Sequence, residues 1–139
     1  MLADLGGPLI DQAVAARLVP RMEEIRQADH VVLRERLDLL EKLLGEHLKD
    51  WQWRRPDGGL SLWIRMPGVD SDAFAQVALR HGVELVPGTA MDDGDRFREY
   101  FRFPYGHGPE VLEDVVLRLA RAYADLTRNG PLDTAPVCV

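Results

Sequence analysis

Apolar side chains that recur every three or four positions predict four helices along the chain. The spacing favours helices at about 8–18, from 20 or 22 to about 49, from 70 or 71 to about 81, and from 108 to the turn at 129–131. The second of these carries a leucine stripe opposite a charged face. The third begins at an N-cap residue, Asp70 or Ser71, and Gly82 follows where a left-handed glycine commonly ends a helix.

Alternation of apolar and polar residues predicts strands between these helices. Four strands are expected, at 51–55, 60–66, 83–86 and 100–105. The first two form a hairpin, because residues 56–59 all favour turns, and residues 89–98 form an exposed polar loop. The order α-α-β-β-α-β-β-α favours an α/β fold of the two-layer α+β type, a mixed sheet of about four strands covered by helices.

One domain is expected, because 139 residues are enough for a single hydrophobic core. We assign residues 1–7 to a lead-in, residues 8–127 to the domain and residues 128–139 to a disordered tail. The net charge of −6 argues against a nucleic-acid partner, since affinity for nucleic acid comes chiefly from lysine and arginine that neutralise phosphates.

Cysteine usage and the terminal sequence favour a cytoplasmic location. Cys138 is the only cysteine, which excludes an internal disulfide and fits a reducing compartment. Residues 1–7 contain neither the basic nor the apolar region of a signal peptide. No apolar run approaches the roughly 18–20 residues that a membrane span needs. We therefore expect no membrane contact.

Most chemical signatures are missing from the sequence. The four histidines lie far apart in the chain, without the spacing of metal ligands, so no metal site is predicted. Ser61 and Ser71 lack a nucleophile motif, so no catalytic residue is predicted. The acidic residues of the 89–98 loop lack the ligand spacing of a calcium site. The candidate that remains is Arg102.

Arg102 lies in the aromatic run 100–105, which we interpret as a buried strand. A buried arginine needs a charged partner to offset the cost of its desolvation. Its planar guanidinium binds a carboxylate through two parallel hydrogen bonds. Three interpretations stay open. Arg102 pairs with an internal acid such as Glu99 or Asp95, it lies on an edge strand and faces water, or it binds the carboxylate of a ligand.

Three motifs together resemble a known family. They are residues 56–67 (PDGGLSLWIRMP), 81–88 (HGVELVPG) and 101–105 (FRFPY). In this order they are similar to the small C-terminal domain of fold type I aminotransferases, and most of all to the aminotransferase-like half of MocR-type regulators of the GntR superfamily. The resemblance covers roughly residues 8–127. It implies that Arg102 binds the α-carboxylate of an amino-acid substrate or effector.

The resemblance also implies partners outside these motifs. The family's cofactor is pyridoxal phosphate, held by a lysine, an acid and phosphate-binding groups of a large domain. Lys42 and Lys49, the only lysines, stand in the wrong motif context. We therefore expect a detached small domain that binds no cofactor alone, is inactive alone, docks on the large domain and self-associates, as a homodimer. The alternatives are the small domain of an ordinary aminotransferase and a free-standing module that binds amino acids or a partner protein.

Overall fold

The computed structural model describes residues 8–92 and 94–129. These residues fall into two units that divide between Glu35 and Arg36. The lead-in assigned to residues 1–7 lies outside the described residues, as do residues 130–139 of the assigned tail. Residues 128 and 129 of that tail continue the last helix, so the helix runs two residues beyond the predicted domain boundary.

The unit before Arg36 contains helix α1 (Leu9–Leu18), the short 3-10 helix η1 (Val19–Arg21) and the first part of α2 (Met22–His47). Pro20 stands in η1, where α1 has ended, as the sequence predicts. Helix α1 buries none of its residues, and Leu9 and Ile10 are 81% and 78% exposed. The apolar spacing therefore predicts the helix correctly, but nothing in the described residues covers its apolar side chains.

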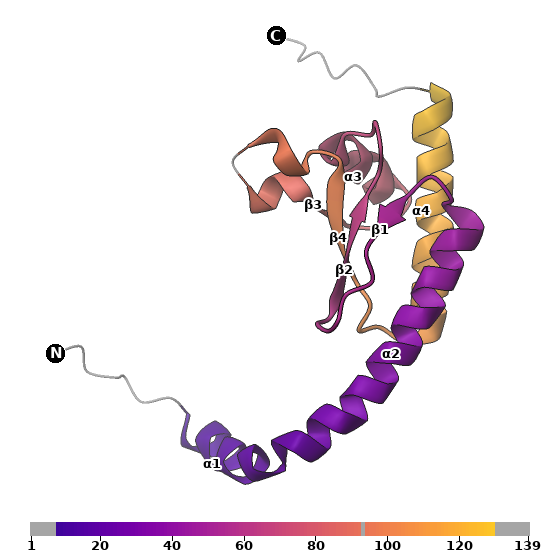
Figure 1. The fold of residues 1–139 in the computed structure, drawn as a ribbon. Helices are drawn as coiled ribbons and strands as arrows, with labels where there is room; N and C mark the ends of the chain where they lie inside the picture. Colours follow the sequence, from indigo (N-terminus) through magenta and orange to yellow (C-terminus); the bar gives the residue numbers. More distant parts are fainter. Residues whose placement is uncertain (1–7, 93, 130–139) are drawn as a thin grey trace, which may run out of the picture. The chain divides into compact units, whose positions relative to one another are not determined.

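The unit from Arg36 onward contains the sheet and its helices (Figure 1). Its elements are the rest of α2, β1 (Gln52–Trp53), β2 (Ser61–Arg65), α3 (Ser71–Arg80), β3 (Val86–Pro87), β4 (Tyr100–Pro104) and α4 (Pro109–Asn129). Asp70 caps α3, and Gly82 has a φ of 76°, as predicted. The third strand is shorter than predicted, with only its last position, Val86, in the sheet. Among the described residues, none of the helices combines the length and the apolar character that a membrane span requires.

The sheet has the strand order β1-β2-β4-β3, and all three pairings are antiparallel. The α+β fold class is confirmed, but the sheet is antiparallel rather than mixed. The reason is the position of β4. Strands β2 and β3, joined through α3, run in the same direction, yet β4 lies between them and pairs with both.

One face of the sheet forms the core. On β2 and β4, the paired residues Leu62 and Phe103, and Ile64 and Phe101, are all buried. Aromatic rings from the helices and from the turn after α2 cover this face. The ring of Trp51, in that turn, lies 5.2 Å from Phe101, 5.6 Å from Phe74 of α3 and 5.6 Å from Tyr123 of α4. On the other face of β2 and β4 the side chains are only half-buried or exposed.

Candidate functional site

Arg102 lies on the open face of the sheet. It stands in the middle of β4 between the buried Phe101 and Phe103, and its side chain is exposed. The expectation of a buried arginine was wrong, because successive side chains of a strand point to opposite faces and helices cover only one of them. The edge-strand part of the second alternative is also wrong, since β4 pairs with β2 on one side and β3 on the other. The side chain does face solvent, as that alternative expects.

The acids predicted as partners of Arg102 bind other groups. Glu99 accepts hydrogen bonds from Arg65 Nε and from the Gly68 amide, each at 2.8 Å. Asp95 lies 3.6 Å from Arg98. Across residues 8–92 and 94–129, no carboxylate forms an ion pair with Arg102. Arg102 is thus exposed on the open side of the sheet without a counter-ion among the described residues.

An aromatic cluster lies next to Arg102 on this face. Trp63 of β2 is the cross-strand partner of Arg102. Its ring stacks on Tyr100, with centroids 5.7 Å apart, and meets the edge of Phe97 at 5.3 Å. The alternation of β2 already places Trp63 opposite the core, but its register against Arg102 cannot be found from sequence alone. These three aromatic rings form an apolar surface beside Arg102.

A hollow of about 250 Å³ also borders Arg102. The segment 82–86, the end of β4 and the first turns of α4 line it. Most of its wall is apolar, and His107 and Glu84 supply the other titratable groups. Sequence reasoning did not predict this hollow, since its walls come from three separate segments.

The loop between β3 and β4 forms the rim of the site and is fixed to α3. It contains two short 3-10 helices, η2 (Gly88–Met91) and η3 (Asp95–Phe97), where the sequence predicts an exposed polar loop over residues 89–98. Asp70 accepts hydrogen bonds from the amides of Asp72 and Ala73 and from Arg98 Nε. Burial raises the pKa of Asp70, but the Ala73 amide and the Arg98 guanidinium outweigh burial and hold its pKa below the ordinary value.

Replacing Asp70 tests this attachment. Asp70→Ala is expected to lower the free energy of unfolding at neutral pH by about 1–2 kcal/mol, because it removes the N-cap of α3. A carboxylate with a lowered folded-state pKa stabilises above its unfolded pKa and loses that effect as pH falls. The free energy of unfolding is measured with urea near pH 7 and at about pH 3. Between these two pH values it should fall further for the wild type than for Asp70→Asn, which keeps a cap but does not titrate. If the unfolding free energy fell equally in both proteins, the ionised Asp70 carboxylate would not stabilise the fold as described.

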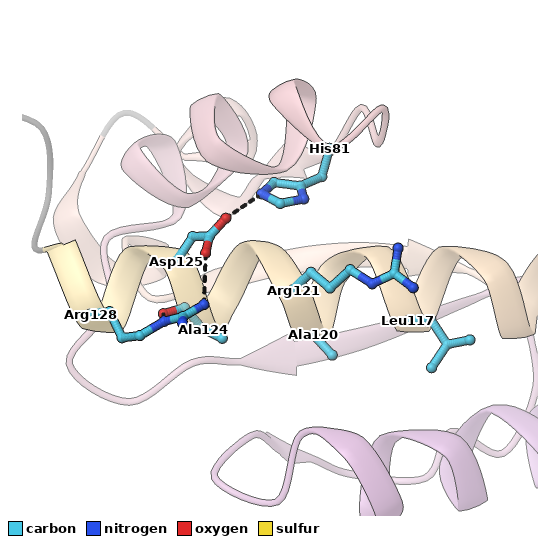
Figure 2. Close-up of a pocket in the computed structure, with 7 residues that line it drawn as sticks. All are labelled: His81, Leu117, Ala120, Arg121, Ala124, Asp125 and Arg128. Atoms are coloured by element: carbon cyan, nitrogen blue, oxygen red, sulfur yellow. Dashed lines mark hydrogen bonds and ion pairs between the residues drawn. The ribbon is translucent and has the colours of Figure 1, made fainter.

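A second hollow, of about 470 Å³, lies between the end of α3 and the outer side of α4 (Figure 2). In it Asp125 lies between His81 and Arg128, with its two oxygens 2.9 Å from His81 Nε2 and 2.9 Å from Arg128 Nη2. The carboxylate of this hollow is thus already bonded to His81 and Arg128, and Arg121 is the other charged residue that lines it.

Neither lysine lies at the candidate site. Lys42 is exposed on α2, Lys49 is exposed just after it, and neither lines either hollow. A pyridoxal-phosphate site needs a lysine for the cofactor's aldehyde and groups for its phosphate and ring nitrogen. The described residues do not fit that cofactor, since neither hollow offers a lysine for its aldehyde.

The chain was compared with known protein families, sequences and solved structures. No family model matches the chain. The structure of α-aminoadipate aminotransferase LysN from Thermus thermophilus, complexed with N-(5′-phosphopyridoxyl)-L-leucine, superposes with a TM-score of 0.80 at 27% identity, over 91% of this chain and 33% of that one. The chain has the fold of one part of an aminotransferase.

Two curated aminotransferases are similar in sequence. The chain is 29% identical over 132 residues to 2-aminoadipate transaminase of Thermus thermophilus, covering 89% of this chain and 32% of the relative. It is 31% identical over 88 residues to aromatic-amino-acid aminotransferase 1 of Thermococcus litoralis, covering 61% of this chain and 21% of the relative. The chain thus spans a third or less of the aminotransferases that it resembles.

Proposed function

We propose that this chain is the small domain of a cytoplasmic, pyridoxal-phosphate-dependent, aminotransferase-like protein. In this proposal Arg102 binds the carboxylate of an amino-acid-like ligand at the border between this small domain and the large domain of the parent protein. The observation that carries it is the exposure of Arg102 on the open sheet face, with no carboxylate partner among the described residues. A bidentate contact with a ligand carboxylate is the interaction for which arginine geometry is best suited.

The proposed partner is a large domain that supplies the cofactor lysine. Two features support this partner. The chain covers about a third of LysN, and the residues described here do not fit the cofactor. The open sheet face and the uncovered apolar side chains of α1 are the surfaces that we assign to contacts with that domain or with a second copy in a homodimer. The chain alone is expected to be inactive.

The parent protein is proposed to be a MocR-type transcriptional regulator, with the amino acid as effector and no nucleic-acid contact from this domain. The three motifs quoted above support this choice. The names of the similar proteins favour an ordinary aminotransferase as the alternative parent. The sequence that precedes this domain in the complete gene product separates the two, because a regulator would carry a winged-helix DNA-binding segment there.

Substitution of Arg102 tests the carboxylate contact in the complete gene product loaded with pyridoxal phosphate. Arg102→Ala is expected to weaken amino-acid binding by about 2 kcal/mol or more, because it removes one partner of a hydrogen-bonded charge pair. Arg102→Lys should recover only part of this, since lysine keeps the charge without the planar fork. The change of cofactor absorbance during titration with a panel of amino acids measures the dissociation constants.

Arg54→Ala is the matched control, because Arg54 is also exposed and lies outside the residues that line either hollow. Its dissociation constants should equal those of the wild type. If Arg102→Ala binds the amino acids as tightly as Arg54→Ala does, the proposed role of Arg102 is wrong.

A further inference from the structure

The hollow beside Arg102 begins where β3 and β4 stop pairing. Val86 pairs with Arg102, so continued pairing would set Glu84 opposite Pro104. Proline has no N–H to donate, and the ladder ends there. The chain between Gly82, at a φ of 76°, and Leu85 therefore leaves the sheet edge and opens a space of about 250 Å³.

The wall of this hollow is mainly aliphatic. Val83, Leu85, Leu112 and Val115 contribute to it, and Val111 lies 48% exposed on the first turns of α4. Its charged lining residues are Arg102 and Glu84, and no ion pair joins them in the structure as described. An apolar space that adjoins an arginine with no counter-ion in residues 8–92 and 94–129 is suited to a ligand with an anionic head and an apolar tail.

We propose that this hollow takes the aliphatic tail of a monocarboxylate whose carboxylate binds Arg102. This inference rests on the proposed role of Arg102 and adds the class of ligand. The volume exceeds the roughly 150 Å³ of a cavity that admits benzene and falls below the roughly 300 Å³ at which drug-sized pockets begin. A tail of about four to six carbons matches that range. A dicarboxylate is disfavoured, because its second charge would meet aliphatic side chains and the Glu84 carboxylate.

Titration of the full 139-residue chain with a series of acids tests the tail. Acetate, butanoate, hexanoate and hexanedioate are added at constant ionic strength, and the valine methyl signals are followed by NMR. Each buried methylene should strengthen binding about fourfold up to hexanoate. Hexanedioate should bind more than tenfold more weakly than hexanoate, and signals of Val83 and Val111 should shift.

Three variants separate the parts of the proposal. Val111→Phe narrows the hollow and should remove most of the increase in affinity from acetate to hexanoate. Leu79→Phe, a like substitution at an exposed α3 position outside the lining residues, should leave that gain unchanged. Arg102→Gln should weaken the binding of acetate and of hexanoate by the same factor, because it removes only the contact with the carboxylate head group.

Failure of this inference differs from failure of the proposed function. If acetate and hexanoate bound with equal affinity, and Arg102→Gln lost this binding, the tail site alone would be overturned. Hexanoate binding that Arg102→Gln leaves intact would overturn the carboxylate role and with it this inference. Absence of hexanoate binding at millimolar concentration would overturn the tail site, while the amino-acid titration of the complete gene product would still decide the role of Arg102.

Discussion

Replacing Phe101 by alanine is expected to lower the free energy of unfolding by about 3–5 kcal/mol. Phe101 is fully buried, and its ring centroid lies 5.2 Å from that of Trp51, 6.2 Å from Phe74 and 6.4 Å from Phe103. Truncation removes apolar contact with the turn after α2, with α3 and within β4, and it leaves a cavity that rigid neighbours cannot fill. Domains are stable by only about 5–15 kcal/mol, so this change removes a large part of the total.

Guanidinium unfolding followed by tryptophan fluorescence measures the loss. Phe101→Leu should cost less than Phe101→Ala, because it leaves a smaller cavity. Leu60→Ala, at a position 60% exposed just before β2, should change the unfolding free energy by no more than about 0.5 kcal/mol. A loss below about 1 kcal/mol for Phe101→Ala would mean that the covered and open faces of the sheet have been assigned the wrong way round.

The position of Phe101 and the position of Arg102 follow from one alternation. Since Phe101 and Phe103 point into the covered face, Arg102 must point out of the open one. The same pattern puts Trp63 on the open face, opposite the buried Leu62 and Ile64. Packing of the core therefore decides which side chains a ligand meets, and a substitution that loosened Phe101 would also disorder the site.

The helices could be predicted from the sequence because their signals are local. Periodic leucines, the Asp70 cap and the left-handed Gly82 each act within a few residues, and α2, α3 and α4 lie close to their predicted bounds. The face of Arg102 was predicted wrongly for a reason that the sequence already contained. Phe-Arg-Phe on a strand places arginine opposite the aromatics, and a sheet covered on one side by helices leaves that arginine exposed.

Features that join distant segments could not be predicted. The register that sets Trp63 beside Arg102 spans two strands separated by α3 and β3. The hollow depends on how residues 82–85 diverge from β4, and Pro104 signals only that pairing must stop there. Coverage of α1 is a further case. Its spacing predicts the helix, but it does not predict that none of the helix's residues is buried.

Gly88→Ala is the second substitution with a large expected effect. Gly88 is buried at the start of the loop that forms the rim of the site. A Cβ atom there would lie 2.2 Å from the Phe97 carbonyl oxygen and 2.8 Å from the Tyr100 carbonyl oxygen. Both are backbone atoms that cannot rotate away, so the loop or β4 must shift. The expected loss of unfolding free energy is about 3 kcal/mol, at the upper end of overpacking costs.

Gly58→Ala provides the matched control for that loss. No atom lies within 4 Å of a Cβ at Gly58, and its φ is not positive. Alanine there should leave stability unchanged or raise it by about 0.4–1 kcal/mol, because it restricts the unfolded chain. Parallel urea titrations of both variants give the comparison. If Gly88→Ala were as stable as Gly58→Ala, the loop could not be packed against Phe97 and Tyr100 as described, and the rim next to Trp63 and Arg102 would have to be placed differently.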